Sequence, residues 1–150
     1  MIVYRITSKK HSKDLTGTGA ALYGGRWNRK GTAVLYTGES KEIALLETIV
    51  HTPPMLIPAL DILTLEIPDD SITTLHIKQL PKNWTNYPAP TILSEIAANW
   101  ISEANTIALK VPSCIIHSSN LYILNCSHPD YYKVKLSDHS SFYFDSRLMK

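Results

Sequence analysis

Y-G-G-R-W-N-R-K-G, residues Tyr23 to Gly31, places glycines directly beside arginine, tryptophan and asparagine. Two interpretations are open. The stretch could be a surface turn, in which Gly24 and Gly25 adopt positive φ and the basic side chains face water. It could instead be an anion cradle, in which the glycines let the backbone approach a phosphate and Arg26 offers a planar fork of donors. The choice depends on the rest of the chain.

The length and composition of the chain predict one ordinary soluble domain. The chain has 150 residues, of which 44% are apolar and 19% charged, a globular composition. A formal net charge of +2 is too small to argue for nucleic-acid binding through bulk electrostatics. No apolar run approaches the roughly 20 residues that span a bilayer, and M-I-V-Y-R-I does not resemble a signal peptide. We therefore expect a cytoplasmic protein with no membrane association, no direct nucleic-acid binding, and buried free thiols at Cys114 and Cys126.

Alternating and β-branched residues predict a sheet-rich core. The expected strands are Ile2–Ile6, Thr32–Thr37, Ile62–Ile67, Thr73–Ile77, Ile107–Val111, Cys114–His117, Tyr122–Asn125, Tyr131–Leu136 and Ser141–Phe144.

Two segments have helical periodicity instead. The first spans residues 41–51, with Ser40 as N-cap, and stops before Pro53-Pro54; the second spans 91–104. Residues 78–90 read as a connecting loop, and no linker or internal repeat divides the chain. The predicted fold is a single mixed α+β domain over residues 1–150.

The glycine-rich stretch does not match the two common nucleotide-binding motifs. A dinucleotide fingerprint that starts at Gly17 needs a glycine where Leu22 stands. A P-loop that starts at Gly19 needs Gly-Lys-Ser/Thr at positions 24–26, which are Gly-Gly-Arg. If a phosphate binds here, it binds in some other fold.

Glu47 and Ser113 are the remaining candidates for chemistry. At 100° per residue, Glu47 lies near Ile43 and Val50 on an apolar helix stripe, and a carboxylate turned inward is a site candidate. The alternative is a glutamate that reaches water or pairs with a structural arginine. Ser113 ends the predicted strand 107–111 in V-P-S and lacks a nucleophile motif, so a turn-stabilising hydroxyl is the simpler interpretation.

The histidines form no metal-binding pattern, so we expect no metal site. His128, in N-C-S-H-P-D, is interpreted as a turn histidine. The segment Y-Y-K-V-K could stack bases, but it also has the alternation of a half-exposed strand, which we favour.

The order of these motifs closely resembles the RES-domain family of bacterial toxins. The resemblance rests on G-x-G-A-x-x-x-G-G-R-W-N-x-x-G, then V-L-Y-T-G-E-S, I-A-L-L-E-T-I-V-H, a late V-P-S and F-D-x-R-L, and it covers nearly the whole chain. It implies a fold similar to ADP-ribosyltransferases and an activity that cleaves the nicotinamide–ribose bond of NAD by hydrolysis or phosphorolysis. NAD is then the substrate, and no separate cofactor is expected.

The resemblance also implies particular residues and a partner. Arg26, Glu47 and Ser113 take the name-giving catalytic positions; the residues expected to bind substrate are Arg5, Tyr36, Trp27 and Asn28. The expected partner is a cognate Xre-type helix-turn-helix antitoxin that forms an oligomer with the toxin, and inorganic phosphate is a candidate acceptor.

The chemistry of NAD fits these residue types. Its pyrophosphate calls for arginine donors beside flexible backbone, and cleavage passes through an oxocarbenium-like ribose that a carboxylate stabilises. Two other functions remain open: a protein mono-ADP-ribosyltransferase toxin, and an RNA-binding or RNA-cleaving module that uses Trp27, Arg29 and Lys30. A third is an inactive scaffold that only binds the antitoxin.

Overall fold

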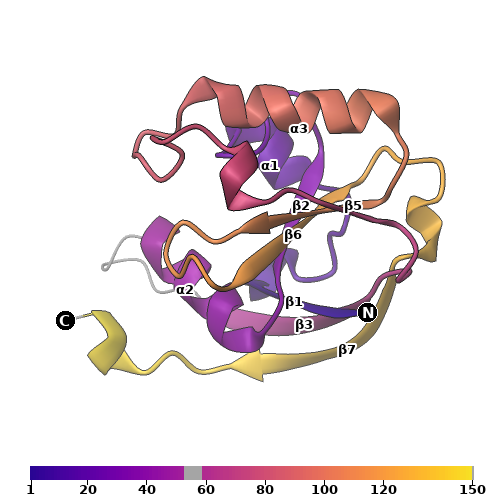
Figure 1. The fold of residues 1–150 in the computed structure, drawn as a ribbon. Helices are drawn as coiled ribbons and strands as arrows, with labels where there is room; N and C mark the ends of the chain where they lie inside the picture. Colours follow the sequence, from indigo (N-terminus) through magenta and orange to yellow (C-terminus); the bar gives the residue numbers. More distant parts are fainter. Residues whose placement is uncertain (53–58, 150) are drawn as a thin grey trace.

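The computed structural model describes residues 1–52 and 59–149, which form one mixed α+β domain (Figure 1). Its strands are β1 (Ile2–Ser8), β2 (Val34–Gly38), β3 (Leu60–Glu66), β4 (Ile72–Thr74), β5 (Ala108–Pro112), β6 (Asn120–Asn125) and β7 (Lys135–Phe142). Its α-helices are α1 (Thr18–Tyr23), α2 (Lys41–His51) and α3 (Thr91–Glu103). Short 3-10 turns occur at η1 (Lys9–His11), η2 (Ile77–Gln79), η3 (Tyr131–Lys133) and η4 (Ser146–Met149). The α+β fold expected from the sequence is confirmed.

The strands form one sheet in the order β4-β5-β6-β2-β1-β3-β7, and all neighbours are antiparallel except β4 and β5. At its centre the sheet is narrowly joined, because β1 and β2 share a single residue pair, Tyr4 with Gly38. By contrast, β1 pairs with β3 along its whole length. The sheet therefore consists of two halves, and Figure 1 shows β5 and β6 above β1, β3 and β7.

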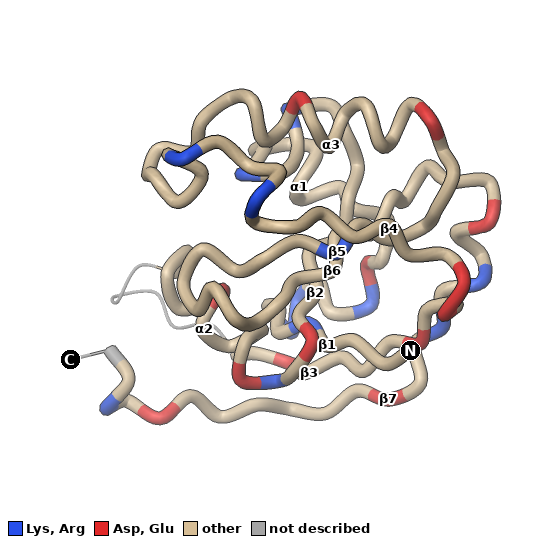
Figure 2. Tube along the Cα trace, in the orientation of Figure 1, with Lys and Arg blue, Asp and Glu red and all other residues tan. Residues whose placement is uncertain are grey.

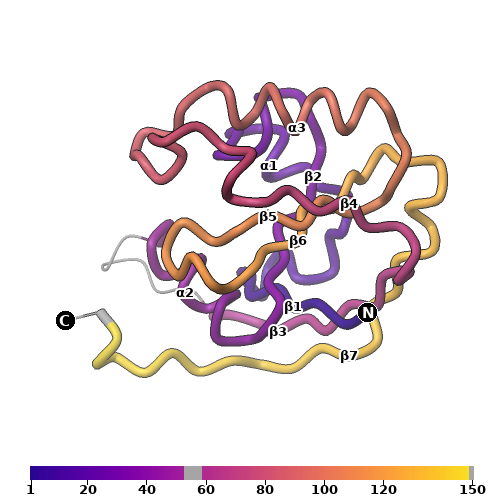
Figure 3. The backbone as a smooth tube through the Cα atoms, viewed as in Figure 1, coloured from indigo at the N-terminus to yellow at the C-terminus, as the bar shows by residue number. Residues whose placement is uncertain are grey.

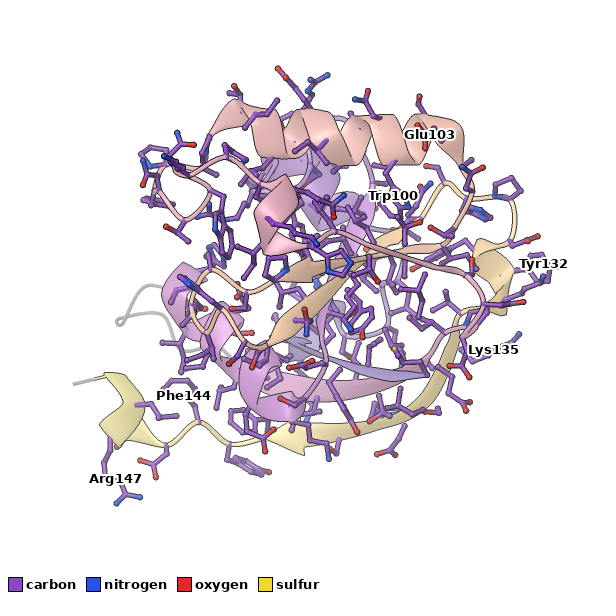
Figure 4. The ribbon with its side chains drawn as sticks, in the orientation of Figure 1. Trp100, Glu103, Tyr132, Lys135, Phe144 and Arg147 are labelled. Atoms are coloured by element: carbon purple, nitrogen blue, oxygen red, sulfur yellow. The ribbon has the colours of Figure 1, made fainter. Side chains whose placement is uncertain are left out.

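The helices cover different halves of the sheet. The apolar face of α3, with Leu93, Ala97 and Trp100, packs against Leu109 and other side chains of the β4-β5-β6-β2 half. Figure 4 shows Trp100 on the sheet side of α3. The helix expected over residues 91–104 is thus confirmed up to Glu103, and Ala104 is its C-cap.

The second helix covers the other half. Ala44 of α2 is buried with Ile6 of β1 and Leu60 of β3. Its N-terminus has the expected cap, because the Ile43 N–H donates to Ser40 Oγ over 3.2 Å. The expected stop at Pro53-Pro54 lies outside the described residues.

The distribution of charged residues does not single out a binding site. Figure 2 shows basic and acidic residues scattered over the described chain, and Figure 3 shows β7 carrying the backbone to a C-terminus far from the N-terminus. Among the described residues, no helix has the length and apolarity required to cross a membrane.

Several sequence expectations about elements are wrong. Residues 114–117 form a turn instead of a strand, because the N–H groups of Ile115 and Ile116 donate to Ser113 Oγ. Residues 131–133 form η3, and β7 runs from Lys135 to Phe142, so one strand joins the end of the segment predicted at 131–136 to the beginning of the segment predicted at 141–144. The strand expected at 73–77 ends at Thr74. Helix α1 was not expected.

Candidate active site

The glycines of the Tyr23–Gly31 loop meet specific steric demands. Gly24 ends α1 with φ of 69°, in the left-handed region that favours glycine. A Cβ at Gly25 would lie 2.7 Å from the Tyr36 hydroxyl oxygen, so this position allows a close approach of the loop to β2. The loop is therefore built against β2 and is not a free surface turn.

Asn28 holds this loop from beneath. Its side chain is 3% exposed; Oδ1 accepts a hydrogen bond from the Tyr36 hydroxyl at 2.7 Å, and Nδ2 donates to the carbonyl oxygens of Ala20 and Thr32. The Tyr36 oxygen in turn accepts from the Trp27 N–H at 3.0 Å. Trp27 is itself almost completely buried in the core. The polar atoms of Asn28 are thus engaged inside the protein, so Trp27 and Asn28 shape the loop from within.

Arg26 projects from the loop to a distant segment. Its Nη1 donates to the carbonyl oxygens of Trp84 at 2.8 Å and Asn86 at 3.0 Å. In the described chain, neither Nε nor Nη2 of this guanidinium makes a hydrogen bond. Arg26 therefore fixes the segment between η2 and α3 and retains donors for an anion.

Glu47 and Ser113 meet directly. The Ser113 hydroxyl donates to Glu47 Oε1 over 3.1 Å, which joins α2 to the end of β5. The same oxygen accepts from the N–H groups of Ile115 and Ile116, and Ser113 is fully buried. Ser113 is thus both the expected turn-stabilising residue and the residue that orients Glu47.

The half-buried Glu47 carboxylate has a perturbed environment. Burial raises the pKa of Glu47, while the hydrogen bond from Ser113 and the charges of His51 and Arg26 oppose that rise. Of the predicted stripe, Ile43 is buried but Val50 is 58% exposed, so the stripe is narrower than expected. A carboxylate stabilised by a hydroxyl and two basic groups is suited to meet developing positive charge.

Tyr36 lies in the same region. Burial raises the pKa of its hydroxyl well above the usual range, and the charges of Arg26 and Glu47 both act on it. The structure therefore gathers Arg26, Tyr36, Glu47 and Ser113 into one candidate site.

Arg5 does not share this region. Tyr4 pairs with Gly38, so Tyr4, Gly38 and Tyr36 share one face of the sheet, and Arg5 projects from the other. Its Nη1 donates to the backbone carbonyl oxygen of Tyr36 at 3.0 Å. Burial lowers the pKa of Arg5, and the groups that oppose this are Cys126, Tyr131 and Asp14, none of which belongs to the site. In this structure Arg5 supports β2 from behind.

Two features of the site were missed by sequence reasoning. His51 lies one helical turn after Glu47, and this i, i+4 spacing in E-T-I-V-H was a usable signal. The carbonyl groups of Trp84 and Asn86 left no such signal, because backbone acceptors in a loop have no sequence signature.

The structure also places His128 and the two cysteines. His128 is a turn histidine: its Nδ1 accepts from the Asp130 N–H, and its Nε2 lies 2.9 Å from the Ala104 carbonyl oxygen. Both cysteines are free and partly buried. Within the described ranges, no cluster of three or more His, Cys, Asp or Glu residues is placed to hold a metal ion.

Fold and site together define a mixed α+β domain with an Arg–Glu–Ser constellation beside a glycine-rich loop. The family model described as "RES domain" matches residues 2–145. The chain therefore belongs to the RES-domain family.

Known proteins agree with this assignment. "Toxin Res" of Photorhabdus laumondii is 38% identical over 154 residues, covering 100% of this chain and 98% of that protein. "Prs ADP-ribosylating toxin" of a Sphingobium species is 31% identical over 141 residues, covering 91% and 88%. The toxin–antitoxin complex MbcT–MbcA of M. tuberculosis matches with a TM-score of 0.75 at 18% identity, covering 99% of this chain and 86% of that one. The last similarity concerns the fold alone.

Proposed function

We propose that this protein is the toxin of a toxin–antitoxin pair and that it cleaves the nicotinamide–ribose bond of NAD. The observation that carries the proposal is the hydrogen bond from Ser113 to Glu47. The charge of Arg26 acts on the Glu47 carboxylate and on the Tyr36 hydroxyl, so these groups belong to the same region. Membership of the RES-domain family and relatives named as toxins support the same function.

Each residue has a physical role in the proposed reaction. The bond between ribose C1′ and the nicotinamide nitrogen breaks, and its electron pair leaves with nicotinamide. Glu47 stabilises the positive charge that develops on the ribose, and Ser113 keeps its carboxylate in place. The donors of Arg26 that do not hold backbone carbonyls bind the pyrophosphate, and Tyr36 holds the glycine-rich loop in place through Trp27 and Asn28. An acceptor then bonds to C1′ and gives up a proton.

The acceptor defines the second candidate. Water or inorganic phosphate gives small-molecule products, whereas a protein side chain gives an ADP-ribosylated protein. The relative named an ADP-ribosylating toxin favours keeping the latter as the alternative. NAD is a substrate in either case, and the reaction requires no further cofactor.

The partner is part of the proposal. A toxin that consumes NAD has to be silenced in its own cell, and the related fold was solved as a toxin–antitoxin complex. We assign this chain an Xre-type antitoxin, one segment of which brings a carboxylate to Arg26 and so occupies the place of the pyrophosphate.

The test is product identification with purified, antitoxin-free protein. NAD is incubated with and without inorganic phosphate and with and without a cell extract, and products are separated by chromatography and identified by mass spectrometry. Nicotinamide release with small-molecule ADP-ribose products supports the leading proposal, and transfer of label to protein bands supports the alternative. Intact NAD under all conditions would reject both.

A further inference from the structure

A second polar hollow lies away from the candidate active site. It has a volume of about 410 Å³ and is lined by Lys9, Ser12, Lys13, Asp61, His139 and Ser141. These residues come from η1 and the loop after it, from β3 and from β7. We call it the Asp61 hollow. Small-ligand sites span about 300–1,000 Å³, so its size suits a small ligand.

Asp61 is the unusual member of this group. It is 5% exposed, yet among the described residues its carboxylate makes no salt bridge and no hydrogen bond within the protein. It is the second residue of β3, where its backbone pairs with both neighbouring strands opposite Thr7 and Ser141. The carboxylate oxygens are not fully enclosed, because Asp61 lines the hollow and keeps contact with solvent there. A carboxylate without a protein partner that faces a hollow of this size can accept hydrogen bonds from a ligand with donors.

Positive charge surrounds the hollow at its edge. Lys9 Nζ donates to Ser141 Oγ at 3.0 Å instead of to the carboxylate, and Lys13 is exposed beside it. His139 pairs with Leu63, two pairs along from Asp61–Ser141, so the register places it on the same face as Asp61. Two lysines would repel a metal cation, whereas they attract the phosphate of an organic ligand.

We propose that the Asp61 hollow binds a small phosphorylated sugar that carries vicinal hydroxyl groups. The Asp61 carboxylate accepts hydrogen bonds from the two hydroxyls, as carboxylates do with ribose, and Lys9 and Lys13 hold the phosphate. Neither half of such a ligand alone satisfies both parts of the hollow.

The hollow is separate from the candidate active site. Leu60 and Ile62, on either side of Asp61, pack in the cluster beneath α2, so Asp61 projects from the opposite face of β3. Glu47 lies on α2 itself. The proposal is therefore independent of NAD cleavage.

The test is calorimetric titration of the full chain with ribose 5-phosphate, 2-deoxyribose 5-phosphate and inorganic phosphate. We expect ribose 5-phosphate to bind, and the other two to bind at least several-fold more weakly. Asp61→Asn should weaken binding by about 10-fold or more, as loss of a charged acceptor does. Asp138→Asn, an exposed change on β7, is the matched control and should bind like the wild type. Lys13→Ala, at an exposed position, should also weaken binding, and it carries the test if Asp61→Asn does not fold.

Three results would overturn the proposal. One is the absence of binding at millimolar ribose 5-phosphate, and another is equal affinity for phosphate alone. The third is loss of binding in Glu47→Gln, because the sugar phosphate would then occupy the candidate active site. Retained binding in Glu47→Gln, whatever its effect on NAD cleavage, supports a separate site.

Discussion

Replacing Glu47 by glutamine separates its chemical role from its structural role. The amide nearly preserves the shape of the side chain, and its Oε1 can still accept the 3.1 Å hydrogen bond from Ser113. The change removes the charge that would face the ribosyl cation. Removing one preorganised electrostatic stabiliser costs about 100- to 1,000-fold in kcat, or about 2.7–4 kcal/mol. We expect this loss in the rate of nicotinamide release.

The melting temperature of Glu47→Gln should not fall with its kcat. Burial raises the pKa of Glu47, which means that the folded protein disfavours the charged form. Glu47→Gln should therefore keep or raise the melting temperature at neutral pH. Glu42→Gln, at an exposed position in the first turn of α2, is the matched control and should leave kcat unchanged. Near-normal kcat in a folded Glu47→Gln protein would refute the assigned role.

Four further outcomes are expected. Arg26→Lys should raise KM for NAD about 10-fold or more, because a point charge loses the bidentate fork, while Arg29→Lys in the same loop should not; equal effects would contradict a specific role. Asn28→Ala should lower the free energy of unfolding by about 2 kcal/mol or more in chemical denaturation, because buried partners lose their hydrogen bonds. As pH is lowered, kcat should begin to fall above the ordinary carboxyl pKa of 4.5, because the raised pKa of Glu47 means that it gains its proton at a higher pH. The free energy of unfolding should fall as pH rises through that raised pKa, because the folded protein disfavours the charged carboxylate. Glu47→Gln should abolish this contribution to the pH dependence of kcat and of stability. Antitoxin and NAD should exclude each other in competition binding, and equal NAD affinity of the free and saturated toxin would place inhibition elsewhere.

Local periodicity predicted the two long helices well. In α3 the repeat of Leu93, Ala97 and Trp100 marks a continuous buried face, and Ser40 supplies a cap for α2. Helix α1 was missed because its six residues include a glycine and none of them is buried, so it has no apolar stripe. The turn after Ser113 was predicted as a strand because Ile115 and Ile116 have high β propensity. In the structure their N–H groups donate to the Ser113 hydroxyl oxygen, and this local interaction outweighs that propensity.

Some features of the candidate site could be predicted from the sequence and others could not. Glu47 could be singled out because helical geometry places it beside an apolar face, and the structure places it half-buried. The contact of Arg26 with Trp84 spans 58 residues and ends on a loop carbonyl, so no local pattern encodes it. The side of the sheet on which Arg5 lies depends on the single pair Tyr4–Gly38, and a strand's alternation does not give its register with another strand.

The central claim is that the Arg26–Glu47–Ser113 site breaks the nicotinamide–ribose bond. Its most direct test is the time course of nicotinamide release from NAD, followed by proton NMR on purified protein with no antitoxin present. The account predicts catalytic release over many turnovers by the wild type and by Glu42→Gln, and a 100-fold or greater reduction in Glu47→Gln. NAD that remains intact with the wild type, or equal release by Glu47→Gln, would contradict it.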